Sequence, residues 1–418
     1  MDLPSMYRLR QIFPRPKEGD PAGAVTRELK ALGLDRTIKP GQRIAITAGS
    51  RGITNISAMV RAAADFVKTA GAEPYVVAAM GSHGGATTPG QLAVLESFGI
   101  TEATMGARIV AGTETVFLGQ SKSGIDVHFD QFASTCDGVI VINRVKFHTT
   151  FTAPNESGLL KMLVVGLGKE KGATMFHGLG QGELPVLLPE IARVILEKMP
   201  ILGGIAIIEN GYEETAMVKG VPKATMVEDE QALLKLAAGL LPRLPVDDID
   251  LLIVHEMGKN YSGTGLDTKV IGRMRLDRVP EPERPVIKKI AVLDLSEESH
   301  GNANGLNLAD VVTRKLIAKV DYGTTAANCI ATTFIQRTAT PLTMDTEKEA
   351  IMTAFKSLGA VEWPKARVVR IKNTLHLDEL WVSEGVLESV KKEAAGRFDV
   401  LAGPDPLEFN EDGTLKRG

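Results

Sequence analysis

Short apolar runs alternate along the first part of the chain with stretches in which apolar residues recur every three or four positions. The short runs are typical of buried strands, and the longer periodicity is typical of helices that pack on a sheet. This alternation predicts parallel sheets with crossover helices. Strands are expected at residues 43–47, 74–80, 137–143 and 204–209, and helices at residues 56–70, 91–98, 157–165, 169–177, 191–199 and 231–241.

A second alternation begins after residues 241–245, whose two prolines favour a linker. There, strands are expected at residues 251–255, 288–295 and 367–371, and a helix at residues 308–318. Domains usually contain about 100–200 residues, so a chain of 418 residues with 44% hydrophobic content suits two of them. We therefore expect an α/β protein with two largely parallel sheets. The first domain is expected at residues 1–245 and the second at residues 246–395, and residues 396–418 are expected to form a tail or to pack back on the first domain.

Charge and cysteine content exclude several classes of partner and site. The 48 basic and 51 acidic residues are mixed along the chain, with a formal net charge of −3, which indicates binding neither to nucleic acid nor to an anionic membrane. No apolar stretch approaches the ~20 residues that span a bilayer. Cys136 and Cys329 are too few for a disulfide framework or a Cys-only zinc site, and such a content is usual in a reducing cytosol. We expect a cytoplasmic protein that binds small molecules and holds any metal through histidine, carboxylate or a cofactor.

Three short motifs resemble nucleotide or metal sites but are incomplete. Residues 178–183 do not complete the G-x-G-x-x-G pattern, and Gly168-Lys169 lacks the earlier glycine and the following Ser or Thr of a P-loop. His255-Glu256 lacks the second histidine of H-E-x-x-H. These departures argue against a dinucleotide-binding fold, an ATPase and a metalloprotease.

Two of the seven histidines follow predicted strands directly. His83 lies in a glycine-rich loop after residues 74–80, and His148 lies in the loop after residues 137–143. Ligands of open α/β sheets bind outside the carboxyl ends of the strands. A lone histidine is more often structural than catalytic, but this position favours a functional role for both residues.

Several motifs around these histidines, taken in order, resemble the lactate racemase family. Residues 146–151 (KFHTTF) and 157–170 (SGLLKMLVVGLGKE), followed by His177, are similar to the family's central segment. Residues 81–83 (GSH), with Thr87 and Thr88, are similar to its upstream loop. Each motif is short, but the ordered set of two histidines, a lysine and a further histidine is more specific, and the order of parts fits over most of the chain.

This resemblance implies a racemase or epimerase of a 2-hydroxy acid that uses a nickel pincer nucleotide. Lys161 matches the lysine joined as a thioamide to the pyridinium-based cofactor, and His177 matches the histidine that completes nickel coordination. His83 and His148 match the acid–base pair. One histidine removes the hydroxyl proton while hydride passes from the α-carbon to the cofactor, and hydride then returns to the other face of the planar keto acid. Each enantiomer needs its own base, and an imidazole with an ordinary pKa of about 6.5 acts as acid or base near neutrality. Proteins of cofactor biosynthesis are the implied partners for loading.

The residues themselves allow simpler interpretations. Lys161 is by default a solvated helix residue, but its neighbours are apolar nearly all round, which favours partial burial and a lowered pKa suited to covalent chemistry. Without the resemblance, His177 is best explained as an imidazolium near a helix C-terminus.

Candidate anion-binding residues come from both predicted domains. Residues 49–55 follow a strand and open a helix, so Ser50 and Thr54 are expected to hold the cofactor phosphate, and Arg51, which aligns with the family's substrate-contacting arginine, to bind a carboxylate. An ordinary turn with an exposed arginine is the alternative. In the second domain, Lys259, Tyr261 and Lys269 flank a glycine-rich loop and are candidates to close over the substrate. We expect the site in a cofactor cleft between the two domains.

The sequence differs from the family pattern at positions expected to face the substrate. Residues 48–52 are Ala-Gly-Ser-Arg-Gly where the family has Asp-x-Thr-Arg-Pro, Gly84 stands where the family has a basic residue, and residues 154–156 lengthen the connection from His148 to Lys161. A 2-hydroxy acid other than lactate is therefore expected. The alternatives are a non-nickel lyase or transferase that uses His83 and His148 as ordinary acid–base groups, and a catalytically inactive relative that only binds the cofactor.

Overall fold

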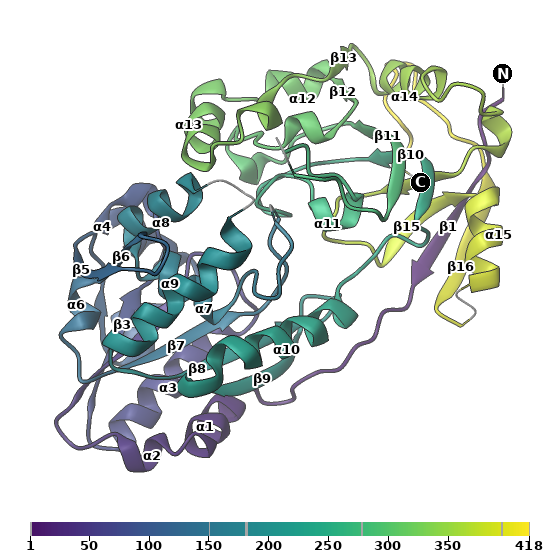
Figure 1. Cartoon of the computed structure of the whole chain (residues 1–418). Helices are drawn as coiled ribbons and strands as arrows, with labels where there is room; N and C mark the ends of the chain where they lie inside the picture. Colours follow the sequence, from purple (N-terminus) through teal and green to yellow (C-terminus); the bar gives the residue numbers. More distant parts are fainter. Residues whose placement is uncertain (1, 150, 180–182, 277–278, 394–395, 418) are drawn as a thin grey trace. The chain divides into compact units, whose positions relative to one another are not determined.

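The computed structural model describes residues 2–149, 151–179, 183–276, 279–393 and 396–417. The chain forms two compact units, seen in Figure 1. The N-terminal unit is Pro14–Leu241, and the C-terminal unit combines Met1–Phe13 with Pro242–Gly418. The expected α/β class with two largely parallel sheets is confirmed. Among the described residues, no helix has the length and apolar content needed to cross a bilayer.

The N-terminal unit is built on a six-stranded sheet with strand order β4-β3-β2-β7-β8-β9. Neighbouring strands are parallel except β8 and β9, which are antiparallel. The strands are β2 (Arg43–Ala48), β3 (Glu73–Ala78), β4 (Arg108–Val110), β7 (Gly138–Arg144), β8 (Ile201–Glu209) and β9 (Thr215–Pro222), with β5 (Thr115–Gln120) and β6 (Asp126–Asp130) forming a separate antiparallel pair.

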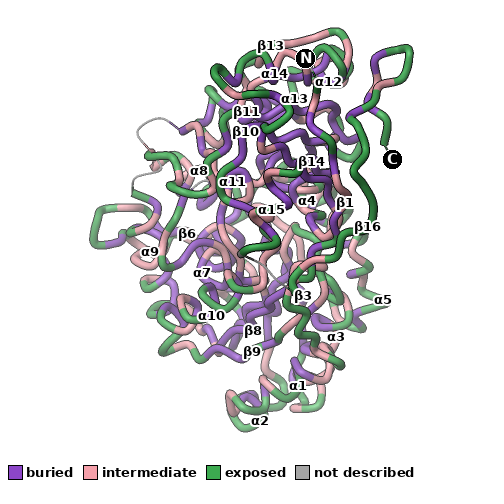
Figure 2. Tube along the Cα trace, turned by 90° about the vertical axis from the view of Figure 1, so that its right-hand side faces the viewer, coloured by how far each residue is buried: buried purple, intermediate pink, exposed green. Residues whose placement is uncertain are grey.

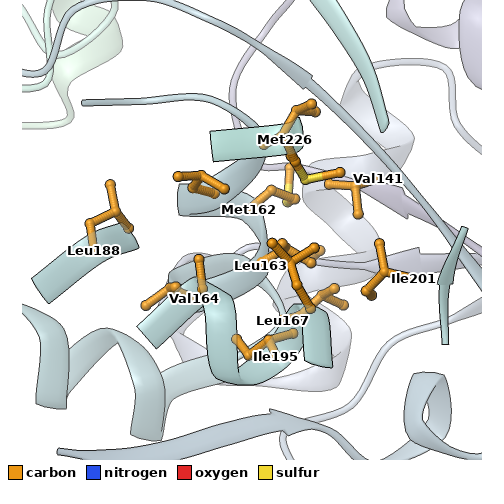
Figure 3. Close-up of a cluster of buried hydrophobic side chains, with 14 of the residues drawn as sticks. Val141, Met162, Leu163, Val164, Leu167, Leu188, Ile195, Ile201 and Met226 are labelled. Carbon is orange, nitrogen blue, oxygen red and sulfur yellow. The ribbon is translucent and has the colours of Figure 1, made fainter. Parts of the chain in front are cut away.

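Helices cover both faces of this sheet, because successive side chains of a strand point to opposite faces. Ile44 and Ile46 of β2 pack in one core with α1 and α3, whereas Ala45 packs in the other core with α7, α8, α9 and α10. Figure 3 shows part of this second core. The helices are α1 (Pro21–Ala31), α2 (Leu34–Thr37), α3 (Ile56–Thr69), α4 (Thr88–Ser97), α5 (Glu102–Met105), α6 (Gln131–Ser134), α7 (Leu159–Lys161), α8 (Lys169–Gly178), α9 (Leu184–Lys198) and α10 (Met226–Leu240).

The C-terminal unit has an eight-stranded sheet with strand order β13-β12-β11-β10-β14-β15-β1-β16. The strands from β13 to β14 are parallel, and β15, β1 and β16 join in antiparallel fashion. The strands are β1 (Met6–Gln11), β10 (Asp248–Val254), β11 (Val286–Val292), β12 (Val311–Thr313), β13 (Leu342–Met344), β14 (Val368–Ile371), β15 (Glu379–Ser383) and β16 (Phe398–Asp405). The helices are α11 (Thr268–Ile271), α12 (Arg314–Ala318), α13 (Tyr322–Thr332), α14 (Glu347–Lys356) and α15 (Glu384–Glu393).

The domain assignment predicted for the two ends of the chain is wrong. Residues 1–13 were assigned to the first domain and the tail from residue 396 was expected to be free or to pack there, but β1 pairs with β15 and β16 in the sheet of the C-terminal unit. The physical reason is that β1 buries few apolar residues, chiefly Met6 and Leu9, and that its partners are distant in sequence. Strand β16 is exposed along most of its length, as Figure 2 shows.

Two predicted helices are corrected. The helix expected at residues 157–165 is a short α7 followed by a π-helix at Met162–Gly166, in which Leu167 N donates to Met162 O at 2.8 Å. Gly166 lies against the end of β3, since a Cβ on it would come within 2.8 Å of Ala79 O. The helix expected at residues 308–318 is limited to α12, because Val311 and Val312 form strand β12 beside β11. β-branched residues favour such a strand.

Candidate active site

Three loops meet at the carboxyl edge of the N-terminal sheet. They follow β2, β3 and β7, which are parallel neighbours, so their carboxyl ends lie at one edge. The π-helix touches two of them: Gly81 N donates to Gly166 O at 3.3 Å, and a Cβ on Gly49 would come within 2.9 Å of Met162 Cε. The loops that bear Ser50 and His83 therefore pack against the segment that follows Lys161.

His148 is in direct contact with Lys161. Lys161 Nζ and His148 Nε2 are 2.5 Å apart, although the two residues come from a loop and a helix. The imidazole is 8% exposed and stacks on Phe151, with ring centroids 4.5 Å apart and an interplanar angle of 27°. The His148 amide donates to Glu156 Oε2 at 2.7 Å. The carboxylate therefore holds the backbone of His148, and stacking on Phe151 orients the imidazole beside the lysine.

The surroundings of Lys161 favour its neutral amine. Burial lowers the pKa of Lys161 to about 7, and the positive charges of Arg51 and Lys146 lower it further in the same direction. The adjacent residues Leu160 and Met162 are buried. The partial burial expected from the apolar sequence around Lys161 is therefore confirmed.

His177 lies near the end of α8 and is half-buried. Burial lowers its pKa to about 4, and the positive charge of Lys161 acts in the same direction. The imidazole is therefore neutral near pH 7. A neutral ring does not fit the simpler interpretation of His177 as an imidazolium at a helix C-terminus, whereas it is the form that binds metals.

His83 is exposed and is held by a neighbouring loop. Ser50 Oγ is hydrogen-bonded to His83 Nδ1, and the phosphate role expected for Ser50 stays a prediction. The loop that bears His83 requires glycine at position 84. Gly84 has a φ of +67°, and a Cβ on it would come within 2.6 Å of Gln91 N in α4.

Thr54 uses both of its donors within the protein. Its amide donates to Glu209 Oε1 at 2.8 Å, and its hydroxyl donates to Glu213 O at 2.5 Å. Glu209 also forms an ion pair with Arg144 at the end of β7. The phosphate role expected for Thr54 stays a prediction, and it requires these bonds to be exchanged.

Several basic side chains lie near Lys161. Desolvation and the positive charge of Arg144 lower the pKa of Arg51. Arg144 forms an ion pair with Glu209, and Arg51 and Lys146 both act electrostatically on Lys161. A cluster of this kind attracts anions, which agrees with the anion-binding role expected for Arg51.

Buried carboxylates that the sequence interpretation missed hold the site's framework. Glu230 of α10 is 1% exposed and accepts a hydrogen bond from Leu160 N at 2.9 Å, at the start of α7. Asn155 donates to Glu230 Oε1 at 3.3 Å. The longer connection between His148 and Lys161, at residues 154–156, is therefore hydrogen-bonded to the same glutamate. Burial raises the pKa of Glu230 to about 7. The sequence signal was weak, namely a charged residue on an otherwise apolar helix face.

The candidates from the second predicted domain belong to the C-terminal unit. Lys259 Nζ donates to Asn328 Oδ1 at 2.8 Å, and Tyr261 Oη donates to Glu256 Oε1. Lys269 lies on α11, where its amide donates to Asp267 Oδ1 at 2.9 Å. Their role toward a substrate stays a prediction, as does the cleft between domains. Of the motifs quoted above, Thr150 and residues 180–182 lie outside the described residues.

Comparisons with known proteins bear on the fold. No protein-family model matches the chain, and no curated protein matches its sequence. Among solved structures, the chain is similar to the lactate racemase apoprotein from Thermoanaerobacterium thermosaccharolyticum, with a TM-score of 0.54, 11% sequence identity, and coverage of 86% of this chain and 93% of that chain. It is also similar to a protein from Thermotoga maritima, with a TM-score of 0.49, 15% identity, and coverage of 66% and 71% of the two chains. The similarity to the lactate racemase apoprotein shows a shared fold.

Proposed function

We propose that this protein is an isomerase, a racemase or epimerase of a 2-hydroxy carboxylic acid, which uses a nickel pincer nucleotide attached to Lys161. The observation that supports this most is the 2.5 Å contact between Lys161 Nζ and His148 Nε2 at an edge where three strand-end loops meet. The shared fold with the lactate racemase apoprotein agrees with it. The proposal includes a cytoplasmic location and loading by cofactor-biosynthesis proteins.

The residues of the site fit such a cofactor. With a pKa of about 7, Lys161 offers a neutral amine for a thioamide link, and His177, with a pKa of about 4, offers a neutral imidazole. The part of the chain that the structure describes contains no group of three or more His, Cys, Asp or Glu side chains able to hold a metal. A metal at His177 then needs further donors, and two sulfurs and a ring carbon of the pincer suit Ni(II). When bound, the cofactor supplies the acceptor and donor of hydride.

The chain's own residues bind the substrate and move the proton. We assign the substrate carboxylate to Arg51, whose planar guanidinium binds carboxylates in a bidentate manner. His83 and His148 each exchange the hydroxyl proton of one enantiomer. His148 directs Nε2 toward Lys161, so we assign Nε2 of His148 as the atom that exchanges the proton, and the bond between Ser50 and Nδ1 orients the His83 ring.

The substrate proposed is a 2-hydroxy acid other than lactate. Gly84 stands where the lactate racemase family has a basic residue, and the backbone of α4 leaves no room for a side chain at this position. The loop around Arg51 also differs from the family pattern. These two differences alter the side of the site that faces the substrate, while the lysine and histidines of the cofactor side are retained.

A racemisation assay tests the proposal. Protein produced together with the cofactor-synthesising proteins is incubated with single enantiomers of a panel of 2-hydroxy acids, and chiral chromatography measures the other enantiomer. We expect conversion of at least one acid, with lactate converted weakly. Arg51→Lys, which retains the charge but loses the bidentate geometry, is expected to raise KM more than it lowers kcat. Activity without nickel would favour ordinary histidine acid–base catalysis, as in a lyase or transferase, and no conversion by loaded protein would favour an inactive cofactor-binding relative.

A further inference from the structure

The Lys161 amine and the His148 imidazole have the arrangement of a nucleophile and its base. Their nitrogen atoms are 2.5 Å apart, the imidazole stacks on the Phe151 ring, and the backbone amide of His148 donates to Glu156. An activated nucleophile is recognised by an adjacent base within hydrogen-bond reach that is itself oriented by further groups. This pair meets that description before any cofactor chemistry is considered.

The charged groups around Lys161 favour the same reactivity. Arg51 and Lys146 stabilise the neutral amine, and His177 on α8 is close enough to respond to the charge of Lys161. The same two cations attract an anionic reagent to the amine. A lysine with a pKa of about 7 is half unprotonated at neutral pH, whereas an ordinary lysine with a pKa of about 10.4 is unprotonated at only about 0.04%.

We propose that Lys161 and His148 form a self-acylating dyad, in which His148 is the catalytic base for transfer of an acyl group from an anionic activated carboxyl compound to the Lys161 amine. Lys161 Nζ attacks the acyl carbon and forms the C–N bond. The bond from that carbon to the leaving group breaks, and the leaving group departs with the electron pair. The proton lost by Nζ passes to His148 Nε2 and then to water.

The same attack on a thioacyl donor, with loss of its leaving group, would give the thioamide that attaches the cofactor without a separate ligase. The identity of the natural donor, a thiocarboxyl-derived group of the pyridinium cofactor, rests on the function proposed above. The reactivity of the dyad does not, because it depends only on Lys161, His148 and the cations around them. The two claims are therefore tested separately by using a simple donor.

Acetyl phosphate is a suitable probe, since it is small, anionic and activated. The full-length protein, expressed without the cofactor-synthesising proteins, is incubated with it at pH 7, and peptide mass spectrometry follows acetylation of each lysine over time. Lys171, an exposed residue of α8, is the internal reference. We expect Lys161 to be acetylated at least about tenfold faster than Lys171, with a rate at Lys161 that levels off above about pH 7.

His148→Gln tests the base, and His128→Gln is the matched control. His128 lies on β6 of the same unit, where Thr115 Oγ1 and His128 Nδ1 are 3.3 Å apart. We expect His148→Gln to slow acetylation of Lys161 about a hundredfold, the low end of the range for general base catalysis, and His128→Gln to leave it unchanged. The Lys171 rate and the circular dichroism spectrum report whether each variant is folded.

Two results would overturn the dyad: acetylation of Lys161 no faster than that of Lys171 in the wild-type protein, or a wild-type rate at Lys161 in folded His148→Gln. Neither depends on nickel or on racemisation. Conversely, fast acetylation of Lys161 together with no covalent cofactor after co-expression would support the dyad and contradict the proposed function.

Discussion

Lys161 and Lys169 flank the π-helix Met162–Gly166 in similar apolar sequence, but their surroundings are opposite. Lys169 is fully buried, and its amine lies 2.7 Å from Asp130 Oδ2 and also donates to Ala78 O. Lys161 is half-buried and faces an imidazole and two cations. Lys169 connects α8 to β6 and β3 through these contacts, whereas Lys161 has the surroundings of a reactive amine. Lys169 is buried beside a carboxylate that pairs with its charge, whereas Lys161 lies beside an imidazole and cations that favour its neutral, reactive amine.

The largest effect on stability is expected from Lys169→Ala, which leaves Asp130 buried without its ion-pair partner. We expect a loss of about 3–5 kcal/mol in the free energy of unfolding, measured by urea denaturation. The double variant Lys169→Met with Asp130→Asn removes both charges and is expected to recover much of that loss. A loss below about 1 kcal/mol in Lys169→Ala would show that the ion pair does not hold α8 in place.

Glu230→Ala is expected to have the next largest effect. It leaves the buried Leu160 amide without its acceptor and removes one of the two acceptors of Asn155 Nδ2, which costs about 1–3 kcal/mol. Because Leu160 precedes Lys161, we also expect slower acylation of Lys161. Glu230→Gln, which keeps an acceptor oxygen, is the control and should lose less. Equal losses in the two variants would contradict the role assigned to the hydrogen bonds.

Glu230 also predicts a pH dependence. Its folded pKa of about 7 exceeds the ordinary value of 4.5, so the folded protein keeps a proton that the unfolded chain releases. Stability contributed by this proton is present below pH 4.5 and is lost as the pH rises toward 7. Unfolding measured across this range should show a decline in the wild-type protein that is weaker in Glu230→Gln. Parallel curves would show that Glu230 titrates normally.

Lys161→Met is expected to destabilise the protein least, and at pH 7 its stability should equal or exceed that of the wild type, because it removes an amine that is costly to protonate in its partly buried place. The folded pKa of Lys161, about 7, lies below the ordinary 10.5, so the unfolded chain binds the extra proton between these values. Wild-type stability relative to Lys161→Met should therefore increase as the pH rises from 7 to 10.5. A constant difference would contradict the lowered pKa.

The sequence predicted the parts of the molecule that depend on local pattern. Strands β2, β3 and β7 were expected because their buried runs are apolar, and the loops of His83 and His148 followed from them. Strand β1 was missed because its partners are β15 and β16, hundreds of residues away. The resemblance to a known family singled out Lys161, but its contact with His148, its electrostatic surroundings and the roles of Glu230 and Asp130 depend on residues distant in sequence. The π-helix packs closely against the end of β3 at Gly166, a contact between residues distant in sequence that no local pattern reveals.

The central claim is that the amine of Lys161 forms a covalent link to a nickel-binding cofactor. Its most direct test is the intact mass of protein produced with and without the cofactor-synthesising proteins, followed by peptide mapping and nickel analysis of the same samples. We predict an added mass on the peptide that contains Lys161 together with bound nickel after co-expression, and neither the adduct nor activity in Lys161→Met. Full activity in Lys161→Met, or an active enzyme free of nickel and of any adduct, would contradict the account.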